Sequence, residues 1–214
     1  MPEILKADNN KSEEIIIARA AAILEAGGII AYPTETFYGL GADAANEDAI
    51  RKIFAIKGRN FHNPISVIIS EEKNLYPLVR EVPDNAQKLI AAFWPGALTI
   101  VFAASDQVSL LLTANSGKIG IRLSSNQAAR DIAARLGHPL TATSANLSGA
   151  PECATAAEVI AQIGAKIDAI VDLGKTPGGR GSTIIDTTID PPAIIREGAI
   201  SRRVIEKKTG IIFK

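Results

Sequence analysis

Short apolar runs alternate with amphipathic segments along the whole chain, and this alternation is the strongest constraint on the fold. We expect helices over residues 12–26, 46–58, 84–93, 126–136, 155–163 and 201–208. We expect strands over residues 28–32, 64–70, 97–103, 118–123, 139–143, 167–173, 183–187 and 193–196. Interleaved strands and helices predict an α/β protein with a sheet flanked by helices, although spacing leaves strand order and direction open.

Composition restricts the classes of protein to which the chain can belong. A hydrophobic content of 47% excludes wholesale disorder. The 23 basic and 23 acidic residues balance, which argues against a globally basic nucleic-acid-binding surface but leaves a local basic pocket open. The single cysteine allows no intramolecular disulfide. There is no signal-peptide pattern and no apolar run near the ~20 residues of a membrane span, so we expect a soluble cytoplasmic protein without a membrane partner.

The segment Pro33–Gly41 (PTETFYGLG) follows the apolar strand 28–32. It combines two threonines, a glutamate and a tyrosine with Gly39 and Gly41, which we interpret as closing a turn. A strand end followed by a polar loop bounded by glycine is typical of a ligand-binding floor.

Two cations stand at the end of the predicted helix 46–58. Lys57 and Arg59 follow its apolar face, where the helix dipole favours positive charge, and Asn63-Pro64 comes directly afterwards. One interpretation is a solvated charge cluster. The other is a phosphate clamp in which lysine is a point charge and arginine a bidentate fork.

A second polar cluster, TATSANLSGA, follows the predicted strand 139–143. Ser144 and Asn146 within it suit an ordinary polar turn. They equally suit a set of ligand-binding donors, because α/β folds place ligands at strand ends.

Arg122 lies within an apolar strand and shares a face with Lys118 and Gly120. It is either an edge-strand charge that faces water or a pocket arginine for a carboxylate or phosphate, with Gly120 leaving room for the ligand. Arg196 has the same two interpretations. The glycine-rich loop 174–182 contains no Walker A ending, and it is either a lid over an anionic substrate or a surface turn.

Several familiar sites are missing from the sequence. His62 and His138 have no matching cluster of Cys or Asp, so we predict no residue that ligates a metal directly. Cys153 has no partner histidine nearby, which argues against a nucleophilic role. Neither a Gly-x-Ser-x-Gly elbow nor a complete G-x-G-x-x-G motif is present.

Taken in order along the chain, the motifs resemble those of the YrdC/Sua family, the threonylcarbamoyl-AMP synthases. The resemblance rests on AYPTETFYGLGADA (31–44), KGR with NP following (57–64), WPGALTIV (94–101), KIGIRL (118–123), TSANLSG (143–149), GSTIID (181–186) and IIREGAI (194–200). The family's Lys, Arg, Ser, Asn quartet is present as Lys57, Arg59, Ser144 and Asn146.

The resemblance implies a YrdC-like fold, similar to the RibB-type fold, with a twisted mixed sheet and a concave ligand cavity. It implies synthesis of L-threonylcarbamoyl-AMP from L-threonine, bicarbonate and ATP, with Mg²⁺ accompanying ATP. The catalytic residues would be Lys57, Arg59, Ser144 and Asn146. The threonine-binding residues would be Thr36, Arg122, Ala142 and Ser182. The ATP-binding residues would be Arg59, Asn63, Lys118, Ser144, Glu152 and Arg196.

The resemblance further implies that a tRNA-modifying transferase complex uses the product on an adenosine in tRNA, with weak binding of tRNA or double-stranded RNA. Ile68 stands where some members have a threonine-contacting histidine, and Lys118 where some have threonine. Longer members append a second domain, so we expect the short form, one domain over residues 1–214 with its core near 12–200 and a terminal helix at 201–208. Two alternatives stay open: a nucleotide- or RNA-binding module that makes no adenylate, and a carbamoyl-transfer paralogue.

Overall fold

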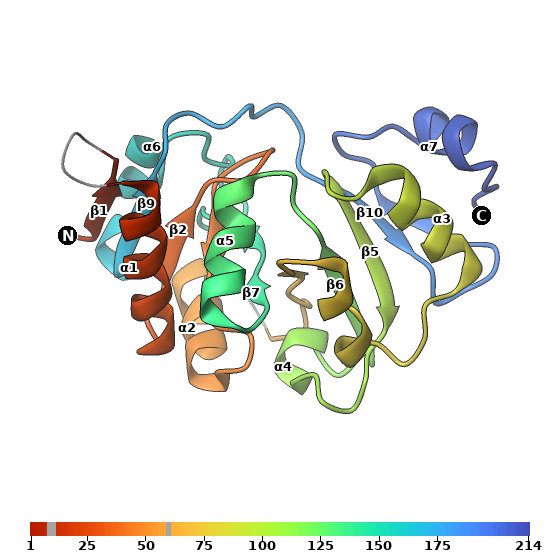
Figure 1. Cartoon of the computed structure of the whole chain (residues 1–214), viewed down its shortest axis with the longest axis horizontal. Coiled ribbons are helices and arrows are strands. Elements are labelled where there is room, and N and C mark those ends of the chain that lie inside the picture. The colour runs from red at the N-terminus through yellow and green to blue at the C-terminus, as the bar shows by residue number, and fades with distance from the viewer. Residues whose placement is uncertain (8–11, 59–60) are drawn as a thin grey trace.

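The structure, a computed structural model, describes residues 1–7, 12–58 and 61–214 (Figure 1). Its α-helices are α1 (Glu13–Glu25), α2 (Glu47–Lys57), α3 (Asp84–Phe93), α4 (Leu110–Thr113), α5 (Gln127–Leu136), α6 (Ala156–Ile163) and α7 (Arg202–Thr209). Its strands are β1 (Glu3–Lys6), β2 (Ile30–Tyr32), β3 (Gly39–Gly41), β4 (Val67–Ile68), β5 (Leu98–Ala103), β6 (Lys118–Arg122), β7 (Leu140–Thr141), β8 (Thr143–Ser144), β9 (Ala169–Asp172), β10 (Thr183–Asp186) and β11 (Ala193–Arg196).

The α/β class is confirmed, but the strands form two sheets where we expected one. The first sheet has the order β1-β9-β2-β3-β8 and the second β11-β10-β5-β6-β4-β7. Both sheets mix parallel and antiparallel pairs. The predicted strand 139–143 splits at Ala142 into β7, which pairs with β4, and β8, which pairs with β3. The sheets therefore meet at this segment, a division that spacing along the chain does not reveal.

Helices α1 and α5 lie side by side over the region where the sheets meet (Figure 1). Their apolar faces pack on residues of both sheets, since the cluster beneath them includes Tyr32 and Val171 from the first sheet and Ile68 and Leu140 from the second. Each fully buried Leu, Ile or Val in such a cluster stabilises the fold by about 1.5–3 kcal/mol. This shared core holds the two sheets in a fixed relation. On the other side of the molecule, α3 packs beside α7.

Most helix ends lie where their capping residues predict. The Asn46 side chain accepts hydrogen bonds from the backbone of Asp48 and Ala49, and Gly58 ends α2 at φ 60°. Thr155 and Glu158 form a capping box at the start of α6. Ser201 precedes α7, but its side chain makes no capping hydrogen bond.

Residues 39–41 are strand β3 and not the turn that we predicted. Gly39 and Gly41 pair with Tyr32 and Ile30 of β2. The polar segment that connects β2 to β3 is therefore the loop of a β-hairpin. The aromatic ring of Tyr32 lies over both glycines: a Cβ atom on Gly39 would stand 2.7 Å from Cζ of Tyr32, and one on Gly41 2.9 Å from Cε1. Glycine is therefore required at these two positions for close packing against the Tyr32 ring. In the sequence such a pair of glycines looks the same as a pair that closes a turn.

Candidate functional site

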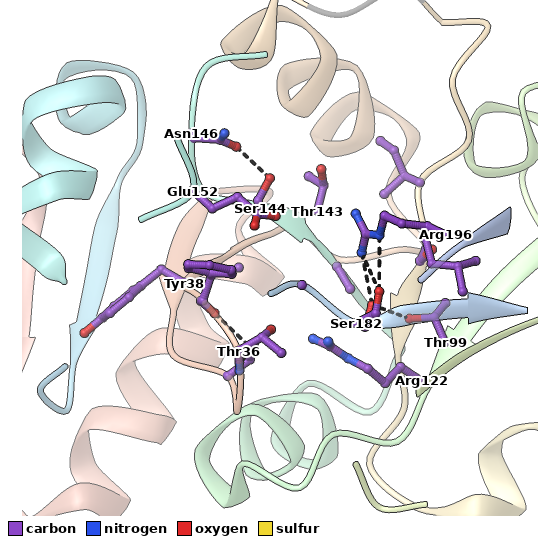
Figure 2. A pocket seen from close by; sticks show the side chains of 18 of the residues that line it. Thr36, Tyr38, Thr99, Arg122, Thr143, Ser144, Asn146, Glu152, Ser182 and Arg196 are labelled. Atoms are coloured by element: carbon purple, nitrogen blue, oxygen red, sulfur yellow. Dashed lines mark hydrogen bonds between the residues drawn. The ribbon is translucent and has the colours of Figure 1, made fainter. Parts of the chain in front are cut away.

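A cavity of about 310 Å³ opens where the two sheets meet. Side chains from the β2–β3 hairpin and β8 enter it from one sheet, and side chains from β5, β6, β10 and β11 from the other (Figure 2). Most of the predicted site residues line it: Thr36, Lys57, Arg122, Ala142, Ser144, Asn146, Glu152, Ser182 and Arg196. Segments distant in sequence thus converge on one polar hollow.

Lys57, the last residue of α2, is buried with 5% of its surface exposed. Its Nζ atom donates to the backbone oxygen of Ser144 at 2.6 Å, and to the backbone oxygen and Oδ1 of Asn146, each at 3.0 Å. The solvated-cluster interpretation is therefore wrong for Lys57. The lysine places its charge in the cavity wall and holds the polar loop that follows β8.

The loop after β8 is itself tightly bonded. The Ser144 hydroxyl donates to Oδ1 of Asn146 at 2.6 Å, and Nδ2 of Asn146 donates to the carbonyl of Ala150 at 2.6 Å. The backbone N–H of Ser148 donates to the carbonyl of Lys57 at 3.2 Å. The segment is a turn that also forms a wall of the cavity, and the binding of a ligand by its donors stays a prediction.

Arg122 ends β6, which lies between β5 and β4 inside the second sheet. Its side chain is only 8% exposed, which excludes an edge-strand charge facing water. Figure 2 shows it extending into the cavity toward Thr36. Gly120 does not leave room for a ligand as we expected, because a Cβ atom there would stand 2.5 Å from the Ser66 hydroxyl.

Hydrogen bonds join Arg196, the last residue of β11, to Ser182, which directly precedes β10. The guanidinium of Arg196 donates to the carbonyl of Ser182 at 2.8 and 3.2 Å, and the Ser182 hydroxyl shares a 2.9 Å hydrogen bond with that of Thr99 (Figure 2). Arg196 itself remains exposed on the cavity rim. A Cβ atom on Gly181 would stand 3.1 Å from the Arg196 guanidinium and 3.4 Å from the Glu152 carboxylate. The guanidinium and the carboxylate therefore both lie next to Gly181.

The hairpin loop supplies Thr36, which is 5% exposed and shares a 3.0 Å hydrogen bond with the Thr34 hydroxyl. The glycine-rich loop 174–182 packs against this region. The backbone N–H of Gly178 donates to the Thr36 carbonyl at 2.8 Å, and the Tyr38 hydroxyl donates to the Gly174 carbonyl at 2.8 Å. These bonds anchor the loop beside the cavity, and its role as a lid stays a prediction.

Two predicted residues in the described part of the chain are not among those that line the cavity. Arg59 lies outside the described residues. Asn63 does not line the cavity, although Pro64 does. Lys118 stands at the opposite end of β6 from Arg122, where its Nζ atom pairs with Oδ2 of Asp186 at 2.8 Å.

The Lys118–Asp186 pair has a local electrostatic effect. Burial raises the pKa of Asp186, but hydrogen bonds from Lys118 and Thr188 outweigh burial and hold that pKa below its ordinary value. Lys118 therefore serves an ion pair in this structure, and an ATP contact at this position is not supported.

Sequence reasoning overlooked Ser66, Thr99 and Thr143, which also line the cavity. Thr99 carried the clearest signal, since it is a hydroxyl residue inside the apolar run 97–103. Ile68, where some members of the family have histidine, is fully buried in the apolar cluster and does not line the cavity.

Other chemistries find little support in the described part of the chain. Burial raises the pKa of the Cys153 thiol to about 11, which keeps it protonated at neutral pH. Within residues 1–7, 12–58 and 61–214, no three His, Cys, Asp or Glu side chains gather into a metal-binding group. No helix in the same ranges has the length and apolar character needed to cross a membrane.

Comparisons with known proteins match this chain to one family. The family model Sua5_yciO_yrdC, described as telomere recombination, matches residues 22–198. The threonylcarbamoyl-AMP synthases of Pyrococcus abyssi and Bacillus subtilis are 38% and 40% identical over 94% and 92% of this chain. The chain spans 59% and 57% of the length of these two relatives, so our expectation of one complete domain over residues 1–214 stays a prediction.

A solved structure extends the likeness to three dimensions. The crystal structure of P. abyssi Sua5 complexed with L-threonine superposes with a TM-score of 0.93 at 36% identity, covering all of this chain and 62% of that one. The matched segment 22–198 contains the whole of the cavity lining described above. The chain therefore belongs to the Sua5/YciO/YrdC family.

Proposed function

We propose that this protein is a threonylcarbamoyl-AMP synthase, a nucleotidyltransferase that makes L-threonylcarbamoyl-AMP from L-threonine, bicarbonate and ATP. The observation that carries the proposal is the convergence of Lys57, Ser144, Asn146, Arg122 and Ser182 on one cavity of about 310 Å³. Family membership and the names of the two relatives support it. The threonine complex of a homologue with the same fold supports the choice of amino acid.

We assign the threonine end of the cavity to Thr36, Arg122, Ala142 and Ser182. The buried guanidinium of Arg122 suits the α-carboxylate of an amino acid, because a bidentate arginine–carboxylate pair is strong where water is excluded. The Thr36 and Ser182 hydroxyls are suited to the polar groups of a small hydroxy amino acid.

We assign the nucleotide end to Ser144, Asn146, Glu152 and Arg196, with Lys57 behind the loop. Arg59 and Asn63 are proposed from the sequence alone. Lys57 contributes positive charge and also fixes Ser144 and Asn146 through three hydrogen bonds. Its role is therefore broader than the phosphate clamp that the sequence suggested.

The reaction requires positioning and charge stabilisation more than covalent catalysis. The threonine amine adds to bicarbonate and water is lost, which leaves a carbamate. A carbamate oxygen then attacks the α-phosphorus of ATP, the bond to the β-phosphate oxygen breaks, and pyrophosphate leaves. Preorganised cations and hydroxyl donors lower the barrier of such a transfer without a protein nucleophile.

The donor set of the cavity suits magnesium that enters with ATP. Glu152 is the carboxylate that lines the cavity among the described residues, and no protein cage of carboxylates surrounds it. Magnesium of this kind keeps phosphate and water ligands, and it neutralises the charge of the triphosphate. We propose that Glu152, the carboxylate of the cavity lining, would contact such a hydrated ion.

The test incubates the protein with ATP, Mg²⁺, bicarbonate and each amino acid in turn, and measures pyrophosphate and AMP adducts. We expect pyrophosphate release that requires both threonine and bicarbonate, together with an adduct of the mass of threonylcarbamoyl-AMP. Serine and valine serve as controls for the methyl and hydroxyl groups of threonine. RNA retention without any pyrophosphate would support a binding module instead, and adduct formation with a different acceptor would support a paralogue. The tRNA-modifying partner and a cytoplasmic location stay predictions.

A further inference from the structure

Glu35 and Arg122 form a buried ion pair that lacks a hydrogen bond. Nη1 of Arg122 lies 3.7 Å from Oε1 of Glu35, and the two side chains are 8% and 14% exposed. That distance exceeds the hydrogen-bond range. Oε1 of Glu35 and Nε of Arg122 are both buried without any hydrogen-bond partner. The pair therefore balances charge without consuming the donors of the arginine.

Glu35 is held behind Arg122 and not inside the cavity. Arg122 lines the cavity, whereas Glu35 does not. The Ser124 hydroxyl donates to Oε2 of Glu35, and the Ser124 carbonyl accepts a hydrogen bond from the guanidinium of Arg130 on α5. This arrangement fixes the carboxylate at one position relative to Arg122, so any influence of Glu35 on a ligand acts through the charge of the arginine.

The other charged side chains that line the cavity contact groups other than Arg122. The Lys57 ammonium is bonded to oxygens of the loop after β8, and Arg196 approaches Glu152 at Gly181. Among the described ion pairs, Glu35 is the carboxylate that Arg122 faces. The formal charges of Arg122 and Glu35 therefore cancel within this pair.

We propose that Glu35 determines specificity by making this end of the cavity select an α-amino acid zwitterion over a ligand with a carboxylate alone. The proposal rests on the proposed function, in which Arg122 binds the threonine carboxylate. A zwitterion brings its own positive charge, so the buried site stays neutral when it binds. A simple carboxylate would leave an uncompensated negative charge near Glu35, and buried charge without compensation is strongly disfavoured.

The experiment compares L-threonine with 3-hydroxybutanoate, which is threonine without its amino group. Isothermal calorimetry of the wild-type protein and Glu35→Gln gives the dissociation constants of both ligands. We expect the wild-type protein to bind threonine at least about tenfold more tightly. In Glu35→Gln the charge of Arg122 is uncompensated, so 3-hydroxybutanoate gains affinity and the preference for threonine falls at least about fivefold.

Glu47→Gln is the matched control, because Glu47 also accepts a serine hydroxyl, that of Ser109, and pairs with an arginine, Arg51, but does so on the surface. It should leave the ratio of the two dissociation constants unchanged. Glu35→Asp keeps the charge and should keep the ratio within about twofold of wild type.

The outcomes separate the two proposals. If the wild-type protein fails to bind threonine, the proposed function is wrong. If threonine binds but Glu35→Gln weakens both ligands by the same factor, Glu35 is only a structural brace and the present inference is overturned. If Glu35→Gln does not fold, two other results would still overturn the inference. One is that the wild-type protein binds the two ligands equally well, and the other is that Glu35→Asp loses the preference for threonine.

Discussion

The ammonium of Lys57 lies 2.6 Å from the backbone oxygen of Ser144, a residue 87 positions later in the chain. The same nitrogen contacts two oxygens of Asn146. A buried cation at the end of α2 thus connects two motifs that the sequence presents as separate. It also explains why neither motif is informative alone: each supplies half of one structural unit in the cavity wall.

Lys57→Met should destabilise the protein and abolish most of its activity. The substitution keeps the length of the side chain but removes the ammonium from three oxygens, of which the Asn146 carbonyl loses its charged donor, and Oδ1 of Asn146 and the Ser144 carbonyl keep only the Ser144 hydroxyl and the Asn146 backbone N–H, respectively. We expect a cost of about 1–3 kcal/mol. The released loop would misplace Ser144 and Asn146, and we expect pyrophosphate release to fall about 100-fold. Urea unfolding and the pyrophosphate assay measure the two effects.

Lys52→Met is the control for this experiment. Lys52 lies on the same helix, and its ammonium donates to one backbone oxygen, that of Gly27, at 2.7 Å. We expect a loss below about 1 kcal/mol and unchanged pyrophosphate release. Equal effects of the two substitutions would show that α2 is merely sensitive to losing a lysine.

Arg122→Lys should weaken threonine binding while it spares ATP. Lysine keeps the positive charge but loses the planar fork that matches a carboxylate. We expect the KM for threonine to rise at least about tenfold and the KM for ATP to stay within about twofold. Arg135→Lys on the exposed side of α5 is the control and should change neither constant. A rise confined to the KM for ATP would reverse our assignment of the two ends of the cavity.

The helices were the most predictable part of the fold, because their signals are local. Asn46 and Gly58 are capping residues whose chemistry acts within one turn. The division into two sheets was not predictable, since it depends on β7 and β8 pairing with different partners on either side of Ala142. Pairing of this kind is a long-range property that periodicity does not record.

The candidate site was predictable as a set of residues but not as an arrangement. Residue type suggested an anion site for Arg122, and the family resemblance implied a nucleotide contact for Lys118, which shares the same face of the same strand. Only the three-dimensional structure separates them, because the cavity lies at the Arg122 end of β6 and Asp186 lies at the Lys118 end. Glu35 was not assigned a role from sequence for the same reason: its significance comes from facing Arg122.

Lys118→Met tests whether this lysine contacts ATP. We expect the KM for ATP to stay within about twofold, because Lys118 does not line the cavity. The lysine is 39% exposed, so the loss of its ion pair should cost less than about 1 kcal/mol. A large rise in the KM for ATP would restore the role that the resemblance implied.

The stability lost in Lys118→Met should depend on pH. The folded pKa of Asp186 is lowered, so its stabilisation is present above the ordinary pKa of 3.8 and is lost as the pH falls through the folded value. The difference in stability between wild type and Lys118→Met should therefore be complete at pH 7 and shrink below pH 3.8. Urea titrations at several pH values measure it, with Lys6→Met, an exposed partner of Asp172, as control.

Cys153 should resist alkylation in the folded protein. Burial raises the pKa of its thiol from 9.0 to about 11, so very little thiolate is present at pH 8. The stabilisation from keeping this thiol neutral is complete below pH 9.0 and is lost as the pH rises toward about 11. Iodoacetamide labelling followed by mass spectrometry should show modification at pH 8 only after unfolding. Cys153→Ala should retain pyrophosphate release, and rapid labelling together with lost activity would point to a functional thiol.

Gly39→Ala should destabilise the hairpin that carries Thr36. The new methyl group would stand 2.7 Å from Cζ of the Tyr32 ring, which is fully buried and donates its hydroxyl hydrogen to the Thr141 carbonyl at 2.8 Å. The ring cannot move without breaking that bond, so we expect a loss of about 1–3 kcal/mol and a weaker affinity for threonine.

Gly164→Ala is the comparison for Gly39→Ala, since a methyl group there meets side-chain atoms of Ile160 at 3.3 and 3.5 Å and of Pro2 at 3.7 Å, which is a milder contact than the 2.7 Å at Gly39. It should change the stability by less than about 1 kcal/mol and leave threonine affinity unchanged. If Gly39→Ala were as stable and as active as wild type, the tight contact between Tyr32 and β3 would not be what shapes the Thr36 loop. The position of Thr36 would then have to depend on its hydrogen bonds to Thr34 and Gly178 alone.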